Sequence, residues 1–109
     1  MIEPGHAFAT TDWATVPVER HDGESGHALW RTRMMGDTRI RMLEYSADYR
    51  ADHWCTRGHI FVVLEGELVS ELDDGRSITL RAGQSYTVSS GKEAHRSSTV
   101  TGAKIFVVD

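Results

Sequence analysis

The chain has 109 residues, which is the usual size of one domain and leaves little room for a second. Hydrophobic residues make up 39% and charged residues 26%, a balance typical of a soluble globular protein. The formal net charge of −4, with acidic and basic residues interspersed, argues against a basic surface for nucleic acid. One cysteine cannot form an intrachain disulfide, and no signal peptide or apolar span is evident, so we expect a cytoplasmic protein that does not bind a membrane.

Short β-rich segments alternate with turn signals along most of the chain. A helical turn is expected at 11–15, and Gly36-Asp37 and Glu65-Gly66 are predicted to be turns between neighbouring strands. No apolar repeat with helical spacing is sustained, so the fold class is predicted to be all-β. The predicted strands are 28–35, 38–45, 59–64, 67–72, 77–81, 86–88, 96–100 and 104–108.

The alternation within two strands predicts their surroundings. Arg39 and Arg41 alternate with apolar residues, so one face of that strand is wet or binds a ligand. We expect these arginines to be solvated, although an inward arginine in a barrel would hold an anionic ligand through its planar fork. Residues 60–64 are apolar on both faces, which predicts a central strand covered on both sides. Met34, Met35 and Met42 are predicted to lie in the core.

Four potential metal ligands stand out. His53, Cys55 and His59 lie at even offsets, so an extended chain would direct their side chains to one face, although Gly58 interrupts regular pairing. Imidazole and thiolate are ligands preferred by zinc and other borderline or soft metals, and His95 offers a fourth donor on a different strand. The spacing alone is also compatible with surface histidines and a buried cysteine that acts as a small hydrophobic residue.

The frame around these donors resembles a known superfamily. The donors at 53–59, followed by an apolar strand that ends in 64–67, resemble the first motif of the cupins, and the segment from Gly83 to His95 resembles the second. The resemblance implies a single-domain cupin, a double-stranded β-helix or jelly-roll barrel. Residues 1–26 would form an N-terminal extension and first strand, and 27–109 the barrel.

A narrower resemblance concerns the run at 51–55, which is similar to that of the DHCW-motif cupin proteins, a group whose activity is largely uncharacterised. In the cupin pattern, His53 matches the first histidine and His95 the histidine of the second motif. Cys55 stands where a histidine is usual, and His59 where a glutamate is usual. The loss of the carboxylate and the gain of a thiol favour zinc or nickel, with iron or copper as alternatives.

Nearby residues are weaker candidates. Asp52 would orient a ligand histidine or, as we rather expect, lie at a surface turn, and Trp54 is expected to pack in the barrel. Tyr86 and Glu71 are candidate pocket residues. No catalytic residue is assigned.

Three functions remain open at this point. The chain would be a metal-dependent enzyme acting on a small molecule, a binding or redox-sensing barrel with a structural metal, or a metal-free ligand-binding barrel. Whether it is an enzyme is left open. A homodimer paired through edge strands and a small-molecule ligand are expected partners, and nucleic acid is not.

Overall fold

A computed structural model describes residue 2 and residues 4–109, and these are almost entirely β-structure. A short 3-10 helix, η1, spans Trp13–Thr15, close to the helical turn predicted from the sequence. The strands are β1 Glu19–Asp22, β2 His27–Met35, β3 Thr38–Tyr45, β4 Tyr49–Arg50, β5 His59–Leu72, β6 Ser77–Arg81, β7 Ser85–Val88, β8 His95–Thr99 and β9 Ala103–Val108. The all-β prediction is therefore confirmed.

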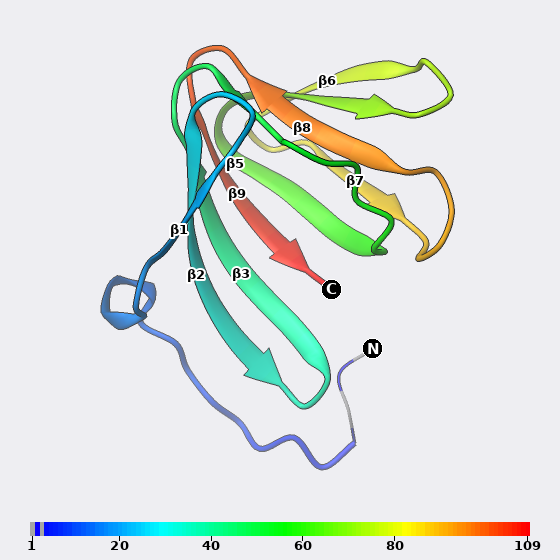
Figure 1. The fold of residues 1–109 in the computed structure, drawn as a ribbon. Coiled ribbons are helices and arrows are strands. Elements are labelled where there is room, and N and C mark those ends of the chain that lie inside the picture. Colours follow the sequence, from blue (N-terminus) through cyan, green and yellow to red (C-terminus); the bar gives the residue numbers. More distant parts are fainter. Residues whose placement is uncertain (1, 3) are drawn as a thin grey trace.

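The strands form one curled antiparallel sheet that folds over on itself (Figure 1). Its order is β1-β2-β3-β9-β5-β8-β4, and β6 and β7 pair with β5 beside this path. The first half of β5 pairs with β7 and β9, whereas the second half pairs with β6 and β8. Because β5 belongs to both layers, its course holds the two walls of the half-barrel together.

The hairpin of β2 and β3 follows the predicted pattern closely. Met35 pairs with Thr38, so Gly36 and Asp37 form a two-residue loop, and Gly36 has a φ of 57°. A positive φ at this position suits the primed turns that match the twist of a hairpin. The local sequence is therefore sufficient to define this element.

The predicted turn at Glu65-Gly66 is wrong. The chain continues through these residues as one 14-residue strand, β5, with a register shift against β9 between Val63 and Glu65. Gly66 has a φ of 81°, and a Cβ there would lie 2.3 Å from the carbonyl oxygen of Gly102. The glycine thus permits a bulge that bends the strand from one layer into the other, where the sequence suggested a reversal.

The core lies between the two layers. It consists of one cluster of buried side chains contributed by four strands: Leu43, Phe61, Val63, Leu68, Leu80, Ala103, Ile105 and Val107. The first half of β5 is not covered on both sides as predicted, because Ile60 and Leu64 are 49% and 42% exposed on its outer face. Met34 is also exposed, contrary to its predicted place in the core, because it lies at the turn end of the β2–β3 hairpin.

The segment before β1 packs on the outside of the sheet. The Trp13 ring meets the ring of Phe106 edge-on, with centroids 6.4 Å apart, and Val16 is buried. Within the described residues, no helix combines the length and the hydropathy that crossing a bilayer requires.

Candidate metal centre and adjoining cavity

Cys55 and His95 are brought together by backbone pairing. An isolated antiparallel bridge joins them, in which each backbone N–H donates to the carbonyl oxygen of the other residue at 2.8 and 3.0 Å. His95 begins β8, whereas Cys55 lies in the irregular segment between β4 and β5. The bridge therefore sets a thiol beside an imidazole although 40 residues separate them in sequence.

His59 enters the same space from the first position of β5. The preceding residue, Gly58, runs so close to the loop after β7 that a Cβ would lie 2.5 Å from the backbone nitrogen of Ser90. The Gly58 N–H also donates to Ser90 Oγ at 2.9 Å. One ligand atom each of Cys55, His59 and His95 lies within 4.8 Å of the others, so these three side chains form a group that could hold a metal ion.

The imidazole of His95 is held in an orientation suitable for a ligand. Its Nδ1 lies 3.0 Å from the backbone oxygen of Glu93, which can only accept, so Nδ1 carries the proton and Nε2 keeps its lone pair. Nε2 is buried and has no hydrogen-bond partner among the described residues. A backbone carbonyl on one ring nitrogen, with the other nitrogen free, is the usual arrangement around a metal-ligating histidine.

Cys55 and His95 also influence each other's ionisation. The His95 imidazole beside the thiol lowers the pKa of Cys55, despite partial burial that would raise it. The same neighbour raises the pKa of His95. Both shifts arise from the proximity of the thiol and the imidazole. The thiolate form, which binds metals, is thereby favoured.

His53 is not part of this group. Residues 52–53 form a bend instead of the extended strand that the even spacing assumed, so the parity argument does not apply to His53. Its side chain is 80% exposed, and its Nδ1 lies 2.6 Å from Asp52 Oδ1. His53 nevertheless lines the cavity described below, at some remove from the three clustered donors.

A second cluster, centred on Asp109, adjoins His59. Val108 of β9 pairs with Ile40 of β3 on one side and with Ile60 of β5 on the other. The residues flanking these partners, Arg39 and His59, therefore lie on either side of Asp109. The register of three adjacent strands thus brings Arg39, His59 and Asp109 together.

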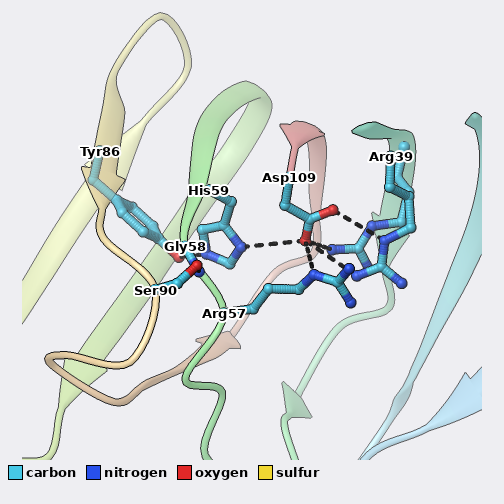
Figure 2. A network of polar contacts seen from close by, with 8 residues as sticks. Arg39, Arg57, Gly58, His59, Tyr86, Ser90 and Asp109 are labelled. Carbon is cyan, nitrogen blue, oxygen red and sulfur yellow. Dashed lines mark hydrogen bonds and ion pairs between the residues drawn. The ribbon is translucent and has the colours of Figure 1, made fainter. Parts of the chain in front are cut away.

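Figure 2 shows how polar groups converge on the Asp109 carboxylate. Arg39 donates to it through Nε and Nη2 at 3.0 and 3.1 Å, and Arg41 Nη2 donates at 3.1 Å. Arg57 Nε and His59 Nδ1 lie 3.6 and 3.7 Å from Oδ2, beyond hydrogen-bond length. The carboxylate side chain is 1% exposed. Burial alone would raise the pKa of Asp109, but interactions with His59, Arg39 and Arg41 outweigh it and hold the pKa well below its usual value.

His59 links the two clusters. Its side chain is 6% exposed, with Nδ1 toward Asp109 and Nε2 at 3.0 Å from the Tyr86 hydroxyl (Figure 2). Burial raises the pKa of Tyr86, so its hydroxyl stays protonated at neutral pH. Tyr86, a candidate pocket residue, therefore reaches the predicted site directly.

A cavity of about 400 Å³ opens onto both clusters. Its wall includes Cys55, His59 and His95 and four arginines, and none of the described residues that line it is aspartate or glutamate.

Trp54 lines this cavity, is 39% exposed, and is not packed in the barrel as expected. Arg96 lies over the Trp54 ring at 4.4 Å and donates to Glu71, which is therefore a partner of a lining residue and does not itself line the cavity.

The expectation that Arg39 and Arg41 are solvated is wrong. Arg41 is only 6% exposed, and both residues line the cavity, because the polar face of β3 is turned inward at this end of the barrel. Asp109 was not singled out in the sequence at all. A signal existed, since Ala103, Ile105 and Val107 are buried at alternate positions and residue 109 continues that parity beyond β9.

The fold is that of solved cupin structures. A predicted oxalate decarboxylase from Thermotoga maritima superposes with a TM-score of 0.75 at 14% identity, covering 92% of this chain and 96% of that one. The polyketide cyclase RemF from Streptomyces resistomycificus gives a TM-score of 0.75 at 20% identity, with 94% and 78% covered. A cupin-2 domain containing protein from Shewanella frigidimarina gives 0.61 at 24% identity, with 73% and 78% covered.

No protein-family model matches the sequence, and no curated protein is significantly similar to it. The likeness to solved structures confirms the predicted cupin fold. At these identities it carries information about fold alone.

Proposed function

We propose that this protein binds one divalent transition-metal ion through Cys55, His59 and His95 and acts there on a small molecule held in the adjoining cavity. The observation that carries the proposal is the approach of the three donors to within 4.8 Å at the wall of a cavity of about 400 Å³. The unpartnered, buried Nε2 of His95 fits the same role. An open position beside three protein ligands is characteristic of catalytic metal sites, whereas structural zinc sites are closed by four.

The donor set favours zinc or nickel. One thiolate and two imidazoles, without a carboxylate, suit borderline and soft ions better than the hard ions that prefer oxygen. A bound ion would supply Lewis acidity toward an oxygen atom of the ligand. The protein's own residues would orient the site: the Glu93 carbonyl fixes the His95 ring, and the Tyr86 hydroxyl and Asp109 flank the His59 ring.

Two of the solved structures with this fold are described as a polyketide cyclase and a predicted oxalate decarboxylase, so the fold accommodates small-molecule enzymes. Fold likeness does not specify a reaction, and the site must carry the argument. His53 as a fourth ligand stays a prediction. It would close the coordination shell and favour the structural or redox-sensing alternative over an enzyme.

Metal content distinguishes these possibilities. We expect about one equivalent of zinc or nickel, by elemental mass spectrometry, in the full chain purified without added metal. Cys55→Ser and His95→Ala should lose the ion while keeping the circular dichroism of the parent. His6→Ala, an exposed histidine outside the barrel strands, is the matched control and should keep it.

His53→Ala decides between an open and a closed site. Retention of the ion supports the three-ligand centre, whereas loss comparable to that in Cys55→Ser would establish a four-ligand site. A parent protein that stays free of metal after incubation with zinc and nickel would overturn the proposal.

A further inference from the structure

The arginines around Asp109 carry more positive charge than the cluster neutralises. Three guanidinium groups, those of Arg39, Arg41 and Arg57, make ion pairs with the one Asp109 carboxylate. The three guanidinium groups and the side-chain carboxylate of Asp109 together carry a net charge of +2, from three positive charges and one negative charge. A charge imbalance of this kind beside a cavity is costly unless solvent or a ligand compensates it.

Arg41 shows the imbalance at atomic detail. It is 6% exposed, its Nη2 donates to Asp109, and its buried Nε has no hydrogen-bond partner among the described residues. Burial lowers the pKa of Arg41, which marks an unfavourable environment for the cation. Since arginine stays protonated in proteins, an unsatisfied N–H of its guanidinium group needs an acceptor from the cavity.

The planes of these guanidinium groups are held in place by Trp30. The guanidinium carbons of Arg41 and Arg39 lie 4.5 and 5.6 Å from the centroid of its ring. Stacking on an aromatic face fixes the orientation of the planar fork and lowers the entropy lost when it binds a carboxylate. Arg96 differs, because Glu71 already accepts two of its N–H groups.

The rest of the cavity wall is rich in aromatic rings. Two pairs are stacked: Tyr45 on Tyr49 with centroids 4.4 Å apart, and Phe61 on Tyr86 with centroids 4.7 Å apart. All four residues line the cavity, together with Trp30 and Trp54. Flat apolar walls with a few convergent polar groups are typical of sites for small organic molecules.

We infer that the cavity is a binding site for a small organic carboxylate with a planar, apolar body, whose carboxylate is bound by Arg41, Arg39 and Arg57. The inference rests on the proposed function, because this anion is the molecule that the Cys55, His59 and His95 centre would act on. The cavity volume of about 400 Å³ suits a ligand of one or two rings. Guanidinium groups recognise planar carboxylates through paired N–H donors, which gives the site its selectivity.

Benzoate and its neutral analogue benzamide test the inference by isothermal titration calorimetry on the full chain, metal-loaded and after chelator treatment. We expect saturable benzoate binding in both forms and at least about tenfold weaker benzamide binding. Inorganic phosphate should also bind more weakly than benzoate, since it lacks the apolar body. Equal affinities for benzoate and benzamide, phosphate binding as tight as benzoate binding, or no saturable benzoate binding would each overturn the inference.

Variants then assign the contact. Arg41→Lys keeps the charge but removes the fork and should weaken benzoate about tenfold, with little effect on benzamide. Arg57→Gln should weaken benzoate by several-fold, and since its side chain is 54% exposed it should fold even if an Arg41 variant does not. Arg20→Gln, an exposed arginine on β1 paired with Asp22, is the matched control and should bind benzoate like the parent. Unchanged benzoate affinity in folded Arg57→Gln and Arg41→Lys would show that the arginines are not the receptor.

The outcomes also separate the two proposals. Arginine-dependent benzoate binding in a protein that never retains metal would refute the proposed function and leave the carboxylate site standing. Metal retention without benzoate binding would refute the carboxylate site and leave the proposed metal centre standing.

Discussion

Two ion-pair clusters in this protein have opposite composition and opposite surroundings. At the end of β9, the buried Asp109 carboxylate forms ion pairs with three arginines. Near the β5–β6 turn, Arg76 forms ion pairs with two carboxylates, those of Asp74 and Glu93, and all three side chains are about half exposed. The exposed cluster tolerates its excess of negative charge because water and salt screen it. In the buried cluster, Asp109, Arg41 and Arg39 are largely shielded from solvent, so their excess of positive charge points to a ligand.

The comparison extends to what each cluster adjoins. Arg76 holds together a surface turn and the loop before β8, and its pKa is raised chiefly by its bond to Asp74. Asp109 instead contacts His59, one of the three clustered metal-ligand candidates. The buried cluster is thus continuous with the candidate centre, and the exposed one behaves as an ordinary solvated network.

The largest effect is expected from removing the buried carboxylate. Asp109→Asn leaves three guanidinium groups without their shared counter-charge and should lower the free energy of unfolding by about 3–5 kcal/mol. Urea unfolding followed by circular dichroism measures this change. Asp74→Asn, the equivalent change in the exposed cluster, should unfold like the parent. A loss for Asp109→Asn no larger than that for Asp74→Asn would remove the distinction drawn here.

The unfolding free energies of the parent and Asp109→Asn should become similar in acid. The pKa of Asp109 is depressed in the folded state, so the stability that its charge contributes is fully present above the ordinary value of 3.8. That contribution is lost as the pH falls through the lower folded-state pKa. The difference in unfolding free energy between parent and Asp109→Asn should therefore be constant from neutral pH to about pH 5 and shrink below about pH 4. A difference that grew in acid would contradict this assignment.

A smaller effect, on metal affinity, is expected from removing the Tyr86 hydroxyl beside His59. Tyr86→Phe removes the hydroxyl 3.0 Å from His59 Nε2 and should weaken zinc binding about tenfold in competition with a chromophoric chelator. Tyr49→Phe is the matched control, since Tyr49 also lines the cavity and its ring is stacked on Tyr45. Equal zinc affinities in the two variants would mean that Tyr86 does not orient the centre.

The smallest effect is expected from Arg76. Because the Arg76 side chain is about half exposed and water and salt screen its ion pairs, Arg76→Gln should leave both the urea midpoint and the benzoate affinity within error of the parent. A measurable loss of benzoate affinity would indicate that the ligand reaches a second hollow of about 270 Å³, which Arg76 lines and which shares Tyr86 and His95 with the cavity.

Several features of this protein follow from local sequence. The hairpin around Gly36 and Asp37 and the all-β class arise because a two-residue turn and period-two alternation depend only on neighbouring residues. The cupin resemblance of 53–67 and 83–95 is also contained in the sequence, and it already pointed to three donors that the fold brings within 4.8 Å.

Other features were decided by tertiary structure. The course of β5 through Gly66 depends on the approach of Gly102, which local sequence does not report. Likewise, the inward direction of Arg41 depends on which face of β3 meets the core. The meeting of Arg39, His59 and Asp109 depends on register across β3, β5 and β9, because a shift of one residue would turn each side chain to the opposite face. The sequence by itself therefore determined the strands and the metal-ligand candidates, whereas the long-range pairing of strands determined the buried charge beside them.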